Sequence, residues 1–282
     1  MQPISGTALP LTSLTHRTSP GSAVGLLPYS GVLANNTADN PYGPHTYPGI
    51  DGGQGIRIPV LFTTRAGTVI EVFQGRAVDS GDTIEDYKWS RINVRRSTDK
   101  GLTWTGAVIN ARTESTPTTN AITNSTIYEY ADGTLAIMFN RGAWSGSAWT
   151  SIREVYEITS ADDGLTWSSP TDISAAFTGS AITNAGTTAA FILGIGKGVT
   201  LPSGRVVVAF YYRAGGPATG TAYPAFVYRD PAGSWTVGAL NESVANADAI
   251  EPSACYCPNA ATAGGILMLC RNLKAGGTQW LL

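Results

Sequence analysis

Arg57 stands between two isoleucines in "QGIRIPVLFTT", residues 54–64, whose second half is typical of a buried strand. A guanidinium keeps its charge, and burying it without an anionic partner is costly. Planar guanidinium groups bind carboxylates through two parallel hydrogen bonds. Two interpretations of Arg57 follow: an arginine at a strand edge that reaches solvent, or a receptor for a carboxylate.

Carboxyl groups are the second kind of residue here that could do chemistry. The segment "AVDSGDTIED" holds Asp79, Asp82 and Asp86, and a carboxyl group in a dry pocket can protonate a leaving oxygen. Each of these acids could also be an ordinary polar loop residue, so their assignment depends on the wider pattern.

The three cysteines, Cys255, Cys257 and Cys270, are interpreted as small buried hydrophobic residues. A disulfide between one of the first two and Cys270 across a hairpin is an alternative, and it would leave one thiol over. Neither histidine, His16 or His45, lies near "CYC" in the sequence. We therefore expect no zinc site and no other cofactor.

Composition restricts the classes of function. Charged residues make up 13% of the chain, about half of the usual quarter, and the formal net charge is −2, so no basic field for nucleic acid or anionic lipid is present. The most apolar segment, "TTAAFILGIGKGVTL", is short and interrupted, which predicts no membrane span. The start "MQPISGTALPLTSL" is no recognisable secretion signal, although the composition suits a secreted, cell-surface or virion-associated protein.

Short segments rich in β-branched and aromatic residues follow one another along most of the chain and predict strands. They are "GTVIEVF", "SRINVRRS", "GTLAIMF", "REVYEITS", "GRVVVAFYY", "AFVYRD" and "GGILMLCRN". No convincing amphipathic helix is present. Residues 1–48 are rich in Ser, Thr, Gly and Pro and are expected to be an extension. Residues 49–282 are expected to form an all-β domain: a sandwich, a barrel or a propeller.

An internal repeat favours the propeller. Residues 97–104, "STDKGLTW", and 160–167, "SADDGLTW", share one pattern, and "YRDPAGSW" at 228–235 is a weaker copy. Their tryptophans are 63 and 68 residues apart, a spacing that suits one four-stranded blade. We expect Asp99 and Asp162 to accept hydrogen bonds from backbone N–H groups, the following glycines to have positive φ, and the tryptophans to fold back as apolar plugs. Both aspartates are thus predicted to be structural.

These octapeptides resemble the Asp-box repeats of sialidases (neuraminidases), which are six-bladed β-propellers. Other segments resemble the family in the right order. "IRIP" is similar to the Arg-Ile-Pro motif that opens the sialidase core, and "GTVIEVFQGR" to the strand that ends in another active-site arginine. "GIGKGVTLPSGRVVVAFYY" is similar to a glycine-rich segment and strand, and "IEPSACY" with "LMLCRN" to the segment of a catalytic glutamate and a later arginine. The resemblance covers residues 50–282 and implies a six-bladed propeller of which about four blades are present.

The resemblance also implies an activity. Exo-α-sialidases release terminal sialic acids from sialylated glycans with retention, and they use a tyrosine nucleophile. It assigns Arg57 and Arg271 to the arginine triad that binds the substrate carboxylate, and Arg76 to a further active-site arginine. Asp82 becomes the acid/base, and Glu251 becomes the base that activates the tyrosine.

Other positions are assigned with alternatives. Asp79 and Asp86 remain rivals as the acid/base, and Glu242 is the alternative to Glu251 as the base that activates the tyrosine. Asn124 would face the N-acyl and glycerol side of the substrate. Trp144 and Trp149 could form an aromatic wall for the sugar or could equally be turn-packing residues.

The family's third triad arginine and its tyrosine nucleophile normally follow the "RN" segment, and the chain reaches only Leu282. No tyrosine is therefore assigned, and we predict that this chain alone does not complete the sialidase cycle and that a further chain could complete the propeller. The alternative function is a non-catalytic propeller that binds sialic acid or other acidic glycans, such as a virion or surface adhesin. Both functions predict that the site residues converge near the propeller axis, with the Asp-box aspartates on the outer rim.

Overall fold

The computed structural model describes ten stretches of the chain. They are residues 54–77, 90–104, 109–113, 121–145, 148–177, 190–213, 221–238, 248–258, 265–272 and 280–281. The extension expected at residues 1–48 lies outside them. Across these stretches the structure contains strands and a single 3-10 turn, Ser174–Ala176, and none of their helical segments could cross a membrane. The all-β class predicted from the sequence is confirmed.

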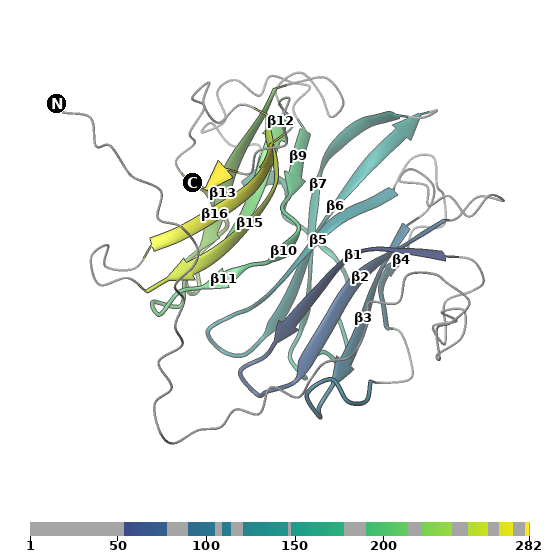
Figure 1. The fold of residues 1–282 in the computed structure, drawn as a ribbon, viewed down its shortest axis with the longest axis vertical. Helices are drawn as coiled ribbons and strands as arrows, with labels where there is room; N and C mark the ends of the chain where they lie inside the picture. The colour runs from purple at the N-terminus through teal and green to yellow at the C-terminus, as the bar shows by residue number, and fades with distance from the viewer. Residues whose placement is uncertain are drawn as a thin grey trace, which may run out of the picture. The chain divides into compact units, whose positions relative to one another are not determined.

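The described strands form four sheets that follow one another in chain order (Figure 1). The first sheet consists of β1 (Gln54–Thr63), β2 (Val69–Ala77), β3 (Ser90–Ser97) and β4 (Ile109–Thr113). The second consists of β5 (Ala121–Glu129), β6 (Leu135–Ser145), β7 (Ala148–Ser160) and β8 (Thr171–Asp172), with the short β10 (Gly196–Lys197) added beside β5. In both, consecutive strands pair antiparallel, as short connections require.

The third and fourth sheets follow the same plan with an interrupted first strand in the third. That first strand is divided into β9 (Ala190–Leu193) and β11 (Val199–Thr200), which both pair with β12, and between them the chain forms β10 (Gly196–Lys197), which belongs to the second sheet. The rest of the sheet is β12 (Val206–Arg213), β13 (Ala222–Arg229) and β14 (Thr236–Val237). The fourth sheet consists of β15 (Ala249–Cys257), β16 (Gly265–Asn272) and β17 (Trp280–Leu281).

Apolar clusters fill the spaces between neighbouring sheets. Ile70 and Val94 of the first sheet pack with Ile137 of the second, and Phe210 belongs to the cluster between the second and third sheets. Met268 belongs to the cluster between the third and fourth sheets. Seven consecutive residues of β12 are buried, because this strand lies in a sheet covered on both faces.

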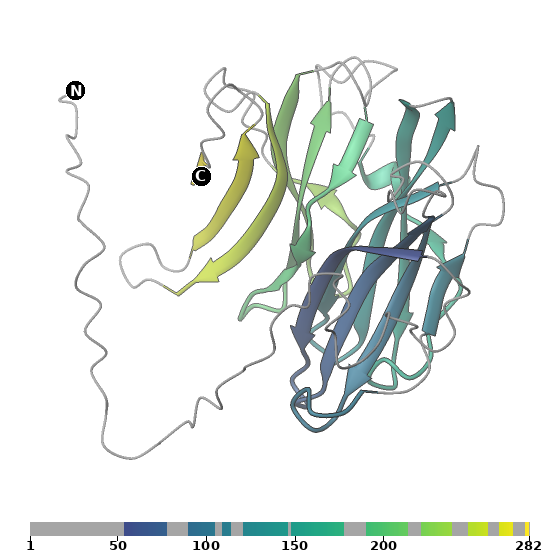
Figure 2. The same ribbon diagram turned by 45° about the vertical axis from the view of Figure 1, so that its right-hand side comes forward.

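The first strands of the four sheets approach one another. β10 pairs in parallel with β5 of the second sheet and also contacts β1 and β15 (Figures 1 and 2). We call β1, β5, β9–β11 and β15 the inner strands. Because the inner strands lie next to one another, residues from several sheets can contribute to one site.

One part of the strand at residues 54–63 differs from the expectation. Val60 is buried and Phe62 is partly buried, as predicted, but the side chain of Leu61 is 63% exposed. Side chains alternate between the two faces of a strand, and only the face with Val60 and Phe62 packs against the second sheet. The prediction that the second half of residues 54–64 is a buried strand is therefore wrong for Leu61.

A buried polar network joins the second and third sheets. Glu157 on β7 is 7% exposed and accepts hydrogen bonds from the hydroxyl groups of Tyr128 and Tyr130. Arg229 on β13 donates to the Tyr130 hydroxyl at 2.7 Å and lies 4.0 Å from the Glu157 carboxylate. Burial, together with Glu157, raises the pKa of Tyr128 far above its usual range, so its hydroxyl remains a donor.

The first Asp-box has the geometry that the sequence predicts. Thr103 N–H donates to Asp99 Oδ1 at 2.8 Å, the Ser97 hydroxyl donates to the same oxygen at 2.6 Å, and Gly101 N–H donates to Ser97 Oγ at 2.8 Å. Gly101 has a φ of 88°. The motif connects β3 with β4, on the side of the sheet away from the inner strands, so a structural role for Asp99 is supported.

The second Asp-box repeats these bonds and packs against the first sheet. Asp162 accepts hydrogen bonds from Thr166 N–H at 2.9 Å and from the Ser160 hydroxyl at 2.7 Å. The neighbouring Asp163 accepts a hydrogen bond from Arg96 of β3 at 2.9 Å. A Cβ at Gly164 would lie 3.0 Å from the side chain of Ile70, so this turn touches the preceding sheet directly.

These bonds predict a pH dependence of stability. Hydrogen bonds, of which the one from the Ser97 side chain has the largest effect, lower the pKa of Asp99 to about 2. Likewise, hydrogen bonds lower the pKa of Asp162 to about 2, and the one from the Thr166 side chain has the largest effect. A carboxyl group with a depressed folded-state pKa stabilises the protein fully above its ordinary pKa of about 3.9, and the contribution disappears as pH falls toward about 2. We expect Asp162→Asn to lower the urea midpoint at neutral pH and the difference from wild type to shrink below about pH 4. An equal difference at both pH values would contradict this assignment.

Candidate active site

Three inner strands carry a bulge. The strand register shifts at Ile58 in β1, at Asn124 in β5 and at Glu251 in β15, and these residues have φ of 53°, 41° and 49°. Positive φ is strained for residues other than glycine, and bulges often redirect a side chain beside a functional site. A bulge with positive φ on the inner strand thus occurs in the first, second and fourth sheets.

Two of the bulges share a local sequence pattern. Ile58 precedes Pro59, and Glu251 precedes Pro252. A proline inside a strand is confined to edges and bulges because it cannot donate to the ladder, and the residue before it normally has an extended backbone. The two prolines were the sequence signal for these bulges, and the strand prediction did not use that signal.

The inner strands of the second, third and fourth sheets touch at the break between β9 and β10. Asn124 Nδ2 donates to the Leu193 carbonyl at 2.7 Å, and the Thr126 hydroxyl donates to the Gly194 carbonyl at 2.9 Å. A Cβ at Gly194 would lie only 2.0 Å from the carbonyl oxygen of Pro252. Glycine is therefore required where the third sheet meets the bulge of the fourth.

Asn140 holds the same segment from the second sheet. Its Oδ1 accepts a hydrogen bond from Leu193 N–H, and its Nδ2 donates to the Phe191 carbonyl, both at 2.7 Å. Asn140 is fully buried, so the side chain replaces a backbone partner for β9. Asn140 was not predicted as a functional residue, and its only signal in the sequence was its position as a polar residue at the end of the apolar run "LAIMF".

The structure brings Glu251 and Arg271 together. Arg271 Nη1 lies 3.2 Å from both carboxylate oxygens of Glu251. The two residues are on adjacent strands, because Arg271 of β16 is opposite Ile250 in the ladder. The arginine side chain is 63% exposed and the glutamate side chain 30%, so the ion pair faces solvent at the bulge of β15.

The other predicted site residues are placed only in part. Arg57 is exposed and lies opposite Gln74 in the ladder of the first sheet. Arg76 lies near the end of β2, opposite Gly55, and its side chain is not described. Asp82 lies outside the described residues.

Several alternatives lie outside the description as well. Asp79, Asp86 and Glu242 are not among the described residues, and the side chains of Trp144 and Trp149 are not described. Their assignments remain predictions.

Tyr211 on β12 is a phenol close to the Glu251–Arg271 pair. It is 7% exposed, and burial raises its pKa to about 12, with Arg213 acting in the opposite direction. A phenol so hard to ionise is a poor nucleophile at neutral pH. Tyr211 is therefore not assigned as the nucleophile.

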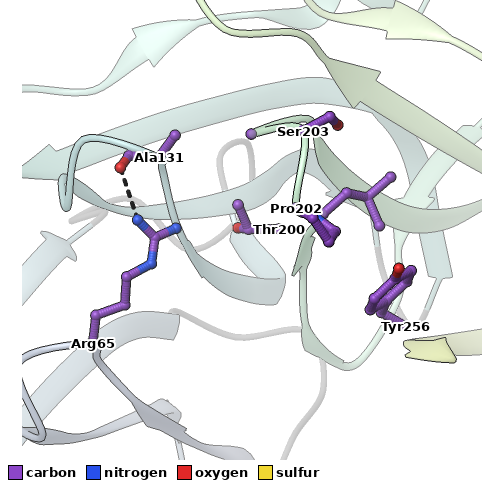
Figure 3. A pocket seen from close by; sticks show the side chains of 8 residues that line it. Arg65, Ala131, Thr200, Pro202, Ser203 and Tyr256 are labelled. Atoms are coloured by element: carbon purple, nitrogen blue, oxygen red, sulfur yellow. Dashed lines mark hydrogen bonds between the residues drawn. The ribbon is translucent and has the colours of Figure 1, made fainter. Parts of the chain in front are cut away.

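A hollow of about 500 Å³ lies at the other end of the inner strands (Figure 3). It is lined by Arg65, Ala131, Thr200, Leu201, Pro202, Ser203, Gly204 and Tyr256. Arg65 Nη1 donates to the Ala131 carbonyl at 2.7 Å, and its Nε lies 4.0 Å from the Glu129 carboxylate. This guanidinium is thus already engaged by the protein, and none of the predicted site residues lines the hollow.

Comparison with known proteins identifies the family. The BNR repeat-like domain matches residues 79–281, which is most of the chain. The chain belongs to this family. The resemblance to Asp-box sialidases that the motifs indicated is thereby confirmed at the level of the family.

Similar proteins agree with this membership. A curated sialidase from Paraclostridium sordellii is 25% identical to this chain over 224 residues. The aligned region covers 74% of this chain and 54% of the relative. The solved structure of the Hadza microbial sialidase Hz136 has a TM-score of 0.63 at 19% identity, with 80% of this chain and 43% of that one covered. The NanB sialidase of Streptococcus pneumoniae has a TM-score of 0.58 at 13% identity, with 84% and 52% covered. The chain thus spans about half the length of these relatives.

Proposed function

We propose that the BNR repeat-like chain contributes four sheets to a six-bladed propeller that acts as an exo-α-sialidase on sialylated glycans. The observation that carries the proposal is the exposed ion pair of Glu251 and Arg271 at the bulge of an inner strand. Support also comes from Arg57, which is exposed next to the matching bulge of the first sheet. The remaining blades, the third triad arginine and the tyrosine nucleophile would come from further polypeptide.

Arg57 and Arg271 would bind the carboxylate of a sialic acid through charge-assisted hydrogen bonds. When the substrate carboxylate arrives, it would compete with Glu251 for the Arg271 guanidinium. Glu251 would then be available to accept the proton of the tyrosine that attacks the anomeric carbon. The binding of substrate would therefore help to activate the base.

Arg76, Asp82 and Asn124 complete the proposed site. Arg76 would add positive charge near the carboxylate, and Asp82 would protonate the departing glycosidic oxygen. Asn124 would lie toward the N-acyl and glycerol groups, from an inner strand fixed to the third sheet through the Leu193 carbonyl. A neutral phenol approaches an anionic substrate more easily than a second carboxylate would.

Binding of sialic acid tests the arginine assignments in this chain. We expect N-acetylneuraminic acid to give saturation-transfer NMR signals that its uncharged methyl ester gives much more weakly. Arg271→Ala should weaken binding about 10- to 100-fold, because a hydrogen bond to a charged group contributes about 1.5–3 kcal/mol. Arg205→Ala is the matched control, since Arg205 is an exposed arginine paired with Asp230 in a turn of the third sheet.

The second step tests catalysis. A longer polypeptide that contains these residues and the missing blades should hydrolyse a fluorogenic sialoside, and Glu251→Gln should reduce its kcat strongly. Binding without turnover in a folded longer protein that has both the arginine and the tyrosine would favour the glycan-binding adhesin instead. Unchanged binding by the Arg57→Ala and Arg271→Ala variants would overturn the site assignment for both functions.

A further inference from the structure

The hollow at the other end of the inner strands is built by all four sheets. Arg65 and Ala131 lie in the connections that follow β1 and β5, and Pro202 lies in the connection that follows β11. The fourth sheet contributes Tyr256, one residue before the end of β15. The volume of about 500 Å³ falls within the range of small-molecule sites. A ligand here would be independent of the proposed function, since the hollow contains none of the proposed active-site residues.

Arg65 is held at one side of the hollow with part of its guanidinium unused. Its Nη1 donates to the Ala131 carbonyl at 2.7 Å, and its backbone N–H donates to Glu129 Oε2 at 2.9 Å. These bonds fix both ends of the residue, while Nη2 has no partner among the described residues. The side chain is 51% exposed, so a ligand can reach it. An arginine that is already fixed loses little conformational entropy when it binds a ligand.

The Glu129 carboxylate limits how strongly this arginine attracts an anion. Glu129 Oε1 lies 4.0 Å from Arg65 Nε, and the glutamate side chain is only 8% exposed. It lowers the net positive charge of the hollow without bonding to Nη2. We therefore expect a singly charged ligand to bind with modest affinity, through the Nη2 edge of the guanidinium.

The other side of the hollow carries an aromatic ring. Figure 3 shows Arg65 and Tyr256 on opposite sides, with Thr200 and Pro202 between them. Tyr256 packs against an apolar cluster together with Leu201, and its hydroxyl group bonds to none of the described residues. This side thus offers apolar ring surface and a free hydroxyl group.

The two neighbours of Tyr256 leave the strand on its other face. Cys255 is exposed and Cys257 is partly exposed, while Cys270 is buried, and all three are free. The prediction of three buried cysteines is therefore wrong for two of them, and the alternative disulfide with Cys270 is not formed. None of these thiols lines the hollow, so Tyr256 alone represents the fourth sheet in it.

We propose that the hollow binds an acidic sugar, that is, a monosaccharide ring that carries a carboxylate. The carboxylate accepts charge-assisted hydrogen bonds from Arg65 Nη2. The sugar ring packs against Tyr256 and Pro202, and its hydroxyl groups exchange hydrogen bonds with the Tyr256 hydroxyl. A neutral sugar leaves Nη2 unused, and a small anion without a ring leaves Tyr256 unused. Only a ligand with both parts matches both sides of the hollow.

Saturation-transfer NMR with glucuronic acid tests the proposal. Glucuronic acid replaces sialic acid as the probe because sialic acid is expected at the proposed active site as well. We expect a dissociation constant on the order of 1 mM, because a ligand of this size makes few contacts in an open hollow. Glucose, which lacks the carboxylate, and acetate, which lacks the ring, should each bind at least about 10-fold more weakly.

Substitutions locate the bound sugar. Arg65→Ala should weaken glucuronate binding about 10-fold or more, and it should fold because the backbone bond to Glu129 remains. Tyr256→Ala should also weaken binding, because it removes the ring surface. Arg205→Ala is the matched control, since this exposed arginine follows the same turn but pairs with Asp230, and it should bind like wild type.

Arg271→Ala separates this site from the proposed active site. The variant should bind glucuronate like wild type, and glucuronate should raise the urea midpoint of both proteins but not that of Arg65→Ala. Equal binding of glucose, equal binding of acetate, or unchanged binding by Arg65→Ala would overturn the proposal. Binding that Arg271→Ala abolishes and Arg65→Ala keeps would overturn it too, while leaving the proposed function intact. A failure of sialic acid to bind would count against the proposed function alone.

Discussion

Gly194→Ala is expected to destabilise the protein by about 3 kcal/mol or more, at or beyond the upper end of the usual range for overpacking. The added Cβ would lie 2.0 Å from the Pro252 carbonyl oxygen and 2.9 Å from that of Ala209. Both atoms are backbone, so no side-chain rotation can relieve the contact, and the third and fourth sheets must separate. Urea denaturation followed by circular dichroism gives the midpoint and slope that measure the loss.

Gly238→Ala is the matched control for this substitution. Its new Cβ would lie 3.4 Å from the Phe226 carbonyl oxygen, which is an ordinary van der Waals contact. We expect a change within about 1 kcal/mol. If both variants unfold at the same urea concentration, the close contact between Gly194 and Pro252 is wrong. In the proposed enzyme, Gly194→Ala should also disturb the adjacent Glu251 and weaken sialic acid binding.

Glu157→Ala is expected to cost about 2–4 kcal/mol, because it leaves tyrosine hydroxyl groups in the interior without their acceptor. The substitution removes the acceptor of both the Tyr128 and Tyr130 hydroxyl groups and the carboxylate that lies 4.0 Å from Arg229. Because Tyr128 is fully buried, water cannot replace the lost acceptor without opening the interface of the second and third sheets. The free energy of unfolding from urea titrations measures this loss.

Glu154→Ala tests whether position on β7 alone explains the effect. Glu154 lies on the same strand and pairs with Arg141, but its side chain is 44% exposed. Exposed ion pairs contribute about 0–1 kcal/mol, so the expected loss is small. Equal losses for the Glu154 and Glu157 variants would show that the buried network does not stabilise the interface.

Local interactions made the Asp-boxes predictable from the sequence. The hydrogen bonds of Asp99 and Asp162 connect residues within five positions of each other, and positive φ occurs at the glycines that the pattern supplies as well as at Lys100 and Asp163 just before them. The strands were predictable for a similar reason, since β-branched and aromatic residues fill them. The resemblance singled out Glu251 and Arg271, which are 20 positions apart, but it did not predict the ion pair that they form with each other.

The features that the sequence did not reveal depend on distant partners. Asn140 is fixed by residues more than 50 positions away, and Glu157 by a network that reaches Arg229 in another sheet. Leu61 was misjudged because an apolar side chain does not indicate which face of its sheet will be covered. The loop with Asp82 lies outside the described residues, so the acid/base assignment is still a prediction.

The contact between the second Asp-box and the first sheet has a consequence for how the chain assembles. The turn that contains Asp163 and Gly164 closes against Arg96 and Ile70, which precede it in the chain by more than 60 residues. During synthesis the first sheet leaves the ribosome earlier, so it can serve as a template on which the later turn closes. Trp235, which packs against Tyr128, repeats this dependence one sheet later. In both cases a later segment of the chain packs against a sheet that has already been synthesised.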